Sequence, residues 1–520
     1  MHEPSDQVDV IRLLADAKTH GVNTVERIDT HASIVFLAGT RALKLKRAVK
    51  YDYLDFSTPV LRHRFCDAEL RINRRLAPAL YRRVLPVVRT ASGTLALGGA
   101  GEPVDWVIEM TRFDQNALFD RMAADGRLDL ALMGPLAEEI ASFHESSAVH
   151  FDHGGEAGIR RVIDGNAAGF REVPSDALEP TACDALTSAA RAALRTCAPV
   201  LESRRLAGFV RVCHGDLHLG NIVLCDGRPT LFDAIEFNDD IACIDVLYDV
   251  SFLLMDLWQR SLPAHANAVL NAYLRETPDF EGLAALPLFL SCRAAIRAKT
   301  TATAAALQTT TDAQRVMRAR AADYLALAQR LLQRTAPLVV AIGGLSGSGK
   351  STIARALAPS LGMAPGAIVL RSDDIRKRLW GVSPLTKLDA SAYTPEMSAR
   401  VYQALADGAA SVVASGHSVI VDAVFAQAAD RAAIERAARG AGAAFAALWL
   451  DAPEHVLIER VAHREADASD ADADVVRMQC AQAAGDVRWP HVDAVADVDQ
   501  VYRRVHASLQ QQAVPLNAAA

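Results

Sequence analysis

A glycine-rich octapeptide, GLSGSGKS at residues 344–351, limits the folds open to this chain more than any other segment. It matches the pattern G-x-x-x-x-G-K-[ST] at every fixed position, and the apolar run LVVAIGG at 338–344 predicts a buried strand directly before it. Glycines there let backbone N–H groups curl around a phosphate, and the following helix points its positive end at the same group. We expect Lys350 to reach the β- and γ-phosphates of ATP and the Ser351 hydroxyl to coordinate Mg²⁺. The residues expected to bind the nucleotide are Gly344, Ser346, Gly347, Ser348, Gly349, Lys350, Ser351 and Thr352.

Beyond residue 338 the sequence alternates strand-like runs with alanine-rich helical segments, which predicts a parallel α/β sheet. The further strand-like runs lie at 367–372, 418–425 and 444–452. Asp373 comes at the end of the second strand, on the sheet edge that faces the ligand in such folds, so it is a candidate base for an attacking hydroxyl. Arg376 is a candidate for holding an anionic substrate, and Asp422 for orienting Mg²⁺. A solvated pair of helix-start aspartates is the alternative reading of 373–374.

The segment at roughly 338–505 resembles the P-loop kinases of the zeta-toxin and polynucleotide-kinase group. The resembling stretches are GLSGSGKST, SDDIRKRL, the IVDAVF strand and LDAPEHVLIERVAHRE. The resemblance implies that Asp373 is the base acting on the acceptor hydroxyl and that Arg376 contacts the substrate. It also implies that lid arginines, here Arg460 and Arg464, stabilise the transferring phosphoryl group. The acceptors of this group range from sugar nucleotides to polynucleotide 5′-hydroxyls, so the acceptor stays open.

The first third of the chain is rich in β-favouring runs, and the stretch from Leu128 to Leu332 is mostly helical in its periodicity. The predicted strands lie at 33–39, 41–49, 80–90, 94–99 and 104–113, with a helix at 62–76. Two short runs around Asp226-Gly227 predict a hairpin within the helical stretch. A β-rich lobe followed by a helical lobe with one hairpin is the layout of a protein-kinase-like fold.

The strongest motif of this first part is VCHGDLHLGN at 212–221, followed by LFDAIEF at 231–237. Asp216 and Asn221 have the spacing of a kinase catalytic loop, in which the Asp accepts the hydroxyl proton and the Asn binds Mg²⁺. Asp233 stands where the second metal-binding carboxylate of a kinase is expected, although Ala-Ile replaces the usual Phe-Gly. We expect His214 and His218 to orient the loop rather than to bind metal.

This pattern, H-G-D-L-H-x-G-N-I with a trailing D-x-I-E-F, resembles the aminoglycoside phosphotransferase family of small-molecule kinases, over about residues 30–300. The resemblance implies that Lys44 holds the α- and β-phosphates, with Lys46 as a rival, and that Glu69 is the helix partner of this lysine. It implies that Glu109 and Met110 form the hinge that binds adenine through backbone groups. The sequence departs from protein kinases because THAS at 30–33 replaces the glycine-rich loop.

These observations predict a two-domain chain. We expect a kinase-like domain at 1–332, with lobes at about 20–112 and about 113–332, a linker at 333–337, a P-loop kinase domain at 338–508, and a flexible tail at 509–520. The fold class is α+β for the first domain and α/β for the second.

Composition limits the partners. The formal net charge of −7 argues against nonspecific nucleic-acid binding, and no run of 18 uncharged apolar residues predicts a membrane span. The 8 scattered cysteines contain no C-x-x-C pair, which favours a reducing compartment such as the cytoplasm. His144, His150 and His153 are close in sequence, but without a Cys or carboxylate set they do not favour a zinc site. The sequence does not indicate an oligomeric state.

The function that these features favour is a bifunctional ATP-dependent and Mg²⁺-dependent phosphotransferase, each domain acting on a hydroxyl of a small molecule. One alternative is a single active kinase domain regulated by the other as a nucleotide sensor, which the altered D-A-I element would fit. Another is a polynucleotide 5′-hydroxyl kinase, which the acidic balance and the lack of a basic-aromatic platform disfavour. A fourth is antibiotic resistance, for which the sequence alone places no acidic cleft.

Overall fold

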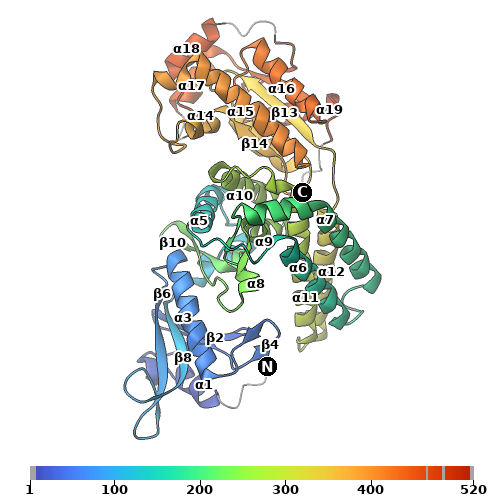
Figure 1. Ribbon diagram of the computed structural model, residues 1–520. Helices are drawn as coiled ribbons and strands as arrows, with labels where there is room; N and C mark the ends of the chain where they lie inside the picture. The colour runs from blue at the N-terminus through green and yellow to red at the C-terminus, as the bar shows by residue number, and fades with distance from the viewer. Residues whose placement is uncertain (1–6, 464–466, 483–486, 516–520) are drawn as a thin grey trace. The chain divides into compact units, whose positions relative to one another are not determined.

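The computed structural model describes residues 7–463, 467–482 and 487–515. The chain forms two compact units, one made of residues 1–159 and 202–253, the other of 160–201 and 254–520. Three helices have residues in both units: α6 (Gly155–Glu172), α7 (Pro180–Leu206) and α9 (Val246–Gln259). Figure 1 labels the main helices and strands.

The first unit is built on an antiparallel sheet with the order β1-β2-β3-β8-β6-β7. Its strands are β1 (Val25–Asp29), β2 (Ser33–Ala38), β3 (Arg41–Lys46), β6 (Tyr81–Arg89), β7 (Leu95–Leu97) and β8 (Glu102–Thr111). Strands β2 and β3 form the predicted hairpin, in which Gly39 adopts a left-handed conformation (φ 60°) that suits a tight turn. Alternate residues of β3 face opposite sides, so that Leu43 and Leu45 pack towards α1 (Val8–Ala15) and Ala42 packs towards α3 (Pro59–Leu76).

The rest of the first unit is mostly helical. Helix α3 begins at Pro59 and is capped by Thr58, whose hydroxyl accepts a hydrogen bond from Leu61 N at 3.3 Å. The remaining elements are α2 (Ala17–His20), β4 (Lys50–Tyr51), β5 (Leu54–Asp55), α4 (Phe119–Ala124), α5 (Met133–Glu145), β9 (Val210–Val212), β10 (Ile222–Cys225), β11 (Arg228–Leu231), α8 (Asp239–Ala242) and β12 (Cys243–Asp245). Strands β10 and β11 form the hairpin predicted around Asp226-Gly227.

The second unit contains a parallel sheet with the order β14-β15-β13-β16-β17. Its strands are β13 (Leu338–Gly344), β14 (Ile368–Arg371), β15 (Val419–Asp422), β16 (Ala444–Asp451) and β17 (His491–Asp493). Its further helices are α10 (Pro263–Glu276), α11 (Leu286–Ala306), α12 (Thr311–Leu331), α13 (Lys350–Leu357), α14 (Ser372–Leu379), α15 (Pro395–Ala414), α16 (Ala428–Gly440), α17 (Glu454–Ala462), α18 (Ala473–Ala481) and α19 (Val498–Gln511).

Helices cover both faces of the parallel sheet, which is why its strands read as continuous apolar runs. Val340 and Ile342 pack in one core with residues of α13 and α19, and the alternate residues of β13 face the side on which α15 and α16 contact the sheet. In the register of the sheet, Asp422 of β15 lies opposite Ile342 of β13 on one side and opposite Arg371 of β14 on the other. The carboxyl ends of three strands therefore meet at one edge.

The fold class predicted from the sequence is confirmed, whereas six short strands among the described residues were missed. These are β1, β4, β5, β9, β12 and β17. The expected tail from residue 509 is also wrong at its start, because α19 continues to Gln511 and the side chains of Leu509 and Val514 are buried in the core of the sheet. Among the described residues, no helix combines the length and the apolar character needed to span a bilayer.

Candidate active sites

The first candidate site lies in the first unit, where β3 and α3 bring a lysine and a glutamate together. Lys44 Nζ lies 2.8 Å from Glu69 Oε1 and also contacts the carboxylate of Asp233. Burial works to lower the pKa of Lys44, but Asp233 and Glu69 outweigh it and raise this pKa well above its ordinary value. Asn73 of α3 fixes the segment after β11, since its Oδ1 accepts a hydrogen bond from Ala234 N at 2.8 Å. Lys44, Glu69 and Asp233, which the sequence indicated in three distant segments, therefore lie together.

Lys46 has a different environment from Lys44, although both point to the same face of the sheet. Its ammonium lies 2.5 Å from Glu69 Oε2 and 2.5 Å from Glu236 Oε1, over the ring of Phe56 at 4.7 Å from the centroid. The side chain of Lys46 is 1% exposed, whereas that of Lys44 is 12% exposed and contacts the more open Asp233. Lys44 is therefore the better placed of the two to reach a phosphate.

The loop 214–221 places the candidate base beside a candidate metal ligand. Asn221 Nδ2 donates hydrogen bonds to Asp216 O at 2.9 Å and to Asp216 Oδ2 at 3.0 Å. The buried Asp249 of α9 anchors the start of the loop by accepting hydrogen bonds from His214 N and Gly215 N, both at 2.9 Å. This anchor was missed from the sequence because Asp249 lies in an apolar helix, 35 residues beyond His214.

Both loop histidines have structural partners. His214 is fully buried, and one of its ring nitrogens lies 2.9 Å from Phe232 O. His218 Nδ1 accepts a hydrogen bond from Gly220 N at 3.0 Å. These contacts agree with a role in orienting the loop.

The residues predicted to form the adenine hinge lie near the end of a strand. Glu109 and Met110 belong to β8, paired with Leu43 and Ala42 of β3 on one side and with β6 on the other. The Glu109 side chain is paired with Arg41 at 2.5 Å and Arg83 at 2.7 Å. Adenine binding by the backbone of these two residues stays a prediction.

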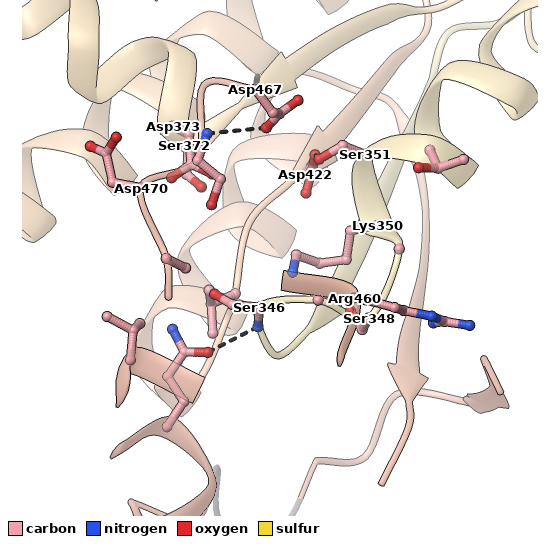
Figure 2. Close-up of a pocket in the computed structure, with 18 of the residues that line it drawn as sticks. Ser346, Ser348, Lys350, Ser351, Ser372, Asp373, Asp422, Arg460, Asp467 and Asp470 are labelled. Atoms are coloured by element: carbon pink, nitrogen blue, oxygen red, sulfur yellow. Dashed lines mark hydrogen bonds between the residues drawn. The ribbon is translucent and has the colours of Figure 1, made fainter. Parts of the chain in front are cut away.

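The second candidate site lies in the second unit, around the loop between β13 and α13 (Figure 2). Residues 346–353 of this loop and helix line a cavity of about 1170 Å³. Gly347 adopts φ 84°, and a Cβ there would lie 2.5 Å from Leu457 O, so the loop requires glycine at this position. Ser351 Oγ donates a hydrogen bond to Asp422 Oδ2 at 2.5 Å, which joins the two expected metal-binding side chains.

Arg371 organises the carboxylates of this site and was missed from the sequence. Its guanidinium lies 2.7 Å from Asp467, 3.4 Å from Asp422 and 3.8 Å from Asp374. Arg371 is the last residue of β14, directly before the Ser-Asp-Asp run, so its position at the strand end was the available signal. The contact with Asp467, 96 residues further on, had no local signal.

The remaining predicted residues line the same cavity, but only some face its centre. Burial raises the pKa of the Asp373 carboxyl, Arg371 opposes this, and Asp422 adds to it. Arg376 Nη1 donates to Ala392 O at 2.7 Å, and its guanidinium lies 4.7 Å from the centroid of the Tyr393 ring. Arg460 Nη2 donates to Ala494 O at 2.8 Å, so this arginine is held by the chain after β17 rather than directed freely at a phosphate. Arg464 lies outside the described residues.

Comparisons with known proteins match both parts of the chain. Residues 52–286 match the Phosphotransferase enzyme family, and residues 339–485 match a family described as AAA domain. Uncharacterized proteins of Mycobacterium bovis and Mycobacterium tuberculosis are 29% identical over 463 residues, which cover 88% of this chain and 89% of theirs.

Two solved structures are similar to part of this chain. A gluconokinase from Sinorhizobium meliloti is 25% identical and covers 35% of this chain and 95% of its own, with a TM-score of 0.25. A choline/ethanolamine kinase family protein from Mesorhizobium loti is 15% identical and covers 62% of this chain and 93% of its own, with a TM-score of 0.40. The two family matches identify the chain as an ATP-dependent phosphotransferase that joins a domain of the Phosphotransferase enzyme family to a P-loop kinase domain.

Proposed function

We propose that the chain is a bifunctional kinase, in which two domains each transfer the γ-phosphate of ATP to a hydroxyl group of a small molecule. The first domain comprises residues 1–332, and the second begins at 338 and includes α19. The observation that supports the proposal is that each region holds its own lysine, aspartates and side-chain oxygen atoms, of the kinds that phosphate binding, base catalysis and cation binding require. Neither set borrows a residue from the other.

In the first domain, Asp216 accepts the proton of the acceptor hydroxyl while that oxygen attacks the γ-phosphorus and the bond to the bridging oxygen of ADP breaks. Lys44 neutralises charge on the phosphates, and Glu69 holds its ammonium in place at 2.8 Å. Asn221 and Asp233 offer oxygen atoms of the kind that Mg²⁺ prefers. Because the Asn221 amide nitrogen faces Asp216, its amide oxygen is directed to the other side.

In the second domain, Asp373 is the proposed base and Lys350 the proposed phosphate ligand. Ser351 and Asp422 would hold Mg²⁺, and their 2.5 Å hydrogen bond places both oxygens at one point of the cavity. When bound, Mg²⁺ neutralises charge on the β- and γ-phosphates. Arg376 lies on the acceptor side with Tyr393, where it is positioned to hold an anionic group of the acceptor.

The lining of this cavity supports a small-molecule acceptor rather than a nucleic acid. Asp389, Asp470 and Asp472 line it together with Asp373 and Arg376. A nucleic-acid strand would bring several phosphates next to these carboxylates, and like charges at short range oppose binding. A compact acceptor with one hydroxyl avoids this repulsion.

Phosphoryl transfer from γ-labelled ATP into a small-molecule extract tests the proposal. We would compare the full-length wild type, Asp216→Ala, Lys350→Ala and the double variant, with Asp312→Ala as the control. Asp312 is an exposed carboxylate in the first turn of α12, outside both sites. We expect each single variant to lose a different labelled product, the double variant to lose both, and the control to keep both.

Other outcomes would redirect the assignment. If only Lys350→Ala removes product, the first domain is a nucleotide sensor or a scaffold. If a 5′-hydroxyl oligonucleotide is labelled and no small molecule is, the second domain is a polynucleotide kinase.

A further inference from the structure

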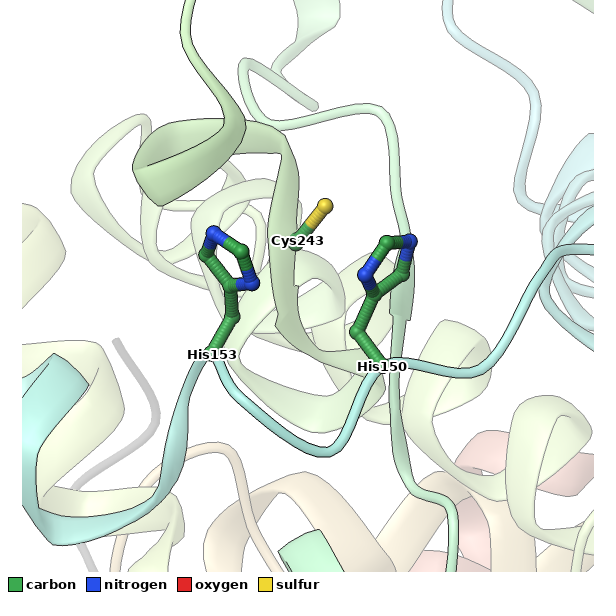
Figure 3. A group of neighbouring side chains, drawn as sticks. All are labelled: His150, His153 and Cys243. Atoms are coloured by element: carbon green, nitrogen blue, oxygen red, sulfur yellow. The ribbon is translucent and has the colours of Figure 1, made fainter.

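Two histidines and a cysteine of the first unit converge outside both candidate active sites (Figure 3). His150, His153 and Cys243 each direct one potential ligand atom to a common point, and these atoms all lie within 4.8 Å of one another. The two imidazole rings are perpendicular, at 89°, with 5.6 Å between their centroids. The sequence offered three neighbouring histidines without a cysteine, and the fold supplies Cys243 from a distant segment.

Backbone pairing fixes the two segments that carry these side chains. His150 N donates to Val210 O at 2.9 Å, and Val212 N donates to Ala148 O at 3.0 Å, so the segment before His150 runs along β9. Strand β12, which begins at Cys243, pairs with β9 as well, with Cys243 opposite Val212. The convergence therefore rests on backbone hydrogen bonds rather than on side-chain rotamers alone.

Asp152 lies beside both histidines and is the nearest candidate for a fourth donor. Its Oδ1 lies 3.3 Å from His153 Nδ1 and 3.8 Å from His150 Nδ1, although the carboxylate is not part of the three-residue cluster itself. Two imidazole nitrogens and a thiolate are three of the four donors of a tetrahedral Zn²⁺ site, and rotation of the exposed Asp152 side chain would supply the fourth. Bonds of about 2.0–2.3 Å place tetrahedral ligand atoms roughly 3.3–3.8 Å apart, so closing the set needs side-chain shifts of about 1 Å.

Charge and access also favour a divalent cation. A thiolate and a carboxylate together balance a charge of +2, and neutral imidazoles complete the set. Asp239, Asp152 and Asp240 act electrostatically on Cys243, and these carboxylates attract a cation to the same place. The Asp152 side chain is 81% exposed, which leaves the site open to solvent on that side.

The described part of the chain holds another His-Cys-carboxylate grouping, in which the carboxylate already has hydrogen-bond partners. It consists of His144, Cys213 and Asp249. Both Asp249 oxygens already accept backbone hydrogen bonds from the catalytic loop, and His144 Nε2 lies 3.1 Å from Oδ2 of the same carboxylate. That grouping is explained by loop positioning.

We propose that His150, Asp152, His153 and Cys243 bind a structural Zn²⁺ ion. The ion ties the segment between α5 and α6 to β12. Since β9 runs directly into the catalytic loop and Cys213 N donates to Ala242 O at 2.8 Å, the ion also stiffens the support of that loop. This site does not depend on which acceptors the two kinase domains use.

Cobalt substitution of the full-length, tag-free protein tests the proposal. We expect the purified wild type to hold one equivalent of zinc, and the chelator-treated protein to take up Co²⁺ with a thiolate-to-cobalt charge-transfer band. Cys243→Ser removes the band and weakens Zn²⁺ binding by at least about 100-fold. Cys183→Ser, the matched control, keeps both, because Cys183 is similarly buried but lies in α7, outside the cluster.

Two further variants keep the test decisive. If Cys243→Ser fails to fold, His153→Asn takes its place in the test. This variant keeps the thiol and should weaken the charge-transfer band. Asp233→Asn should leave the band unchanged, because the kinase Mg²⁺ site contains no thiol. A folded wild type with neither bound zinc nor a charge-transfer band, or a band that survives both cluster variants, overturns the proposal.

Discussion

Replacing the two neighbouring lysines of β3 one at a time should show that Lys46 stabilises the fold and that Lys44 supports catalysis. Lys46→Ala leaves the buried carboxylate of Glu236 without its partner at 2.5 Å, and Glu69 keeps only Lys44. Removing one member of a buried ion pair costs about 3–5 kcal/mol, because the Glu236 carboxyl group, whose pKa burial already raises to about 7, is left desolvated without its partner. Lys44→Ala leaves Glu69 paired with Lys46 and deprives only Asp233, whose side chain is 41% exposed, so we expect a cost of about 1 kcal/mol or less.

Hydrogen exchange of β3 and β8 measures this difference. Lys46→Ala should speed the exchange of their amides by about 10²- to 10⁴-fold, whereas Lys44→Ala should change it by less than about tenfold. Lys50→Ala is the control, because Lys50 is exposed and pairs only with the surface residue Asp55. Adding Glu236→Gln to Lys46→Ala should restore part of the protection, since the unpaired buried carboxyl group is then gone.

The catalytic half of the test uses Lys350→Ala as the background, so that only the first site transfers phosphate. We expect Lys44→Ala to lower that transfer by about 10²- to 10³-fold, as for the loss of one group that stabilises transition-state charge. If Lys44→Ala destabilises the sheet as strongly as Lys46→Ala, the burial argument is wrong. If Lys46→Ala loses transfer with normal protection while Lys44→Ala keeps it, the two roles are reversed.

Four further predictions concern the second unit. Asp373→Asn should lower the rate of product formation at the P-loop site by about 10²- to 10⁴-fold. Burial raises the pKa of Asp373, and a base must be deprotonated to accept a proton. As the pH is lowered, the wild-type kcat/KM for that product should therefore begin to fall at a higher pH than with an ordinary aspartate as the base, which a pH profile would show. Ser351→Ala should raise the Mg²⁺ concentration needed for half-maximal rate by at least about tenfold, with ATP saturating. Asn271→Leu should lower the free energy of unfolding by about 1–3 kcal/mol, read in urea, because Val369 N loses its acceptor at 2.7 Å.

The sequence predicted those parts of the sites whose chemistry is concentrated in short segments. The phosphate loop 344–351 and the catalytic loop 214–221 each carry their backbone turn and their reactive side chains within eight residues or so, and periodicity around them indicated the right elements. The strands missed were β1, β4, β5, β9, β12 and β17. All of these except β1 have two or three residues and are too short for a period to emerge.

Contacts made across long stretches of chain had no such signal. Asn267 and Asn271 of α10 bond to the free edge of β14: Asn267 Nδ2 donates to Ala367 O at 3.0 Å, and Asn271 Oδ1 accepts from Val369 N at 2.7 Å. Two side-chain amides on one helix face thus form hydrogen bonds with backbone groups of this edge that a neighbouring strand would otherwise bind. From sequence alone, both asparagines read as ordinary surface residues of a helix.

The acidic segment from Asp467 onward shows why composition alone misleads at such a site. A run of aspartates indicates a solvated lid, yet the Asp467 carboxylate lies 2.7 Å from Arg371 and that of Asp470 lies 2.7 Å from Lys377. Arg371 is almost fully buried, and a buried guanidinium requires carboxylate partners. Arg371 also lies beside Asp422, which accepts the Ser351 hydrogen bond, and Arg355 of α13 lies 3.1 Å from Asp467, so two arginines join the acidic segment to the phosphate-binding region. The carboxylates of the second site are therefore oriented by pairing with protein cations before a nucleotide arrives, and less reorganisation remains for the transfer step.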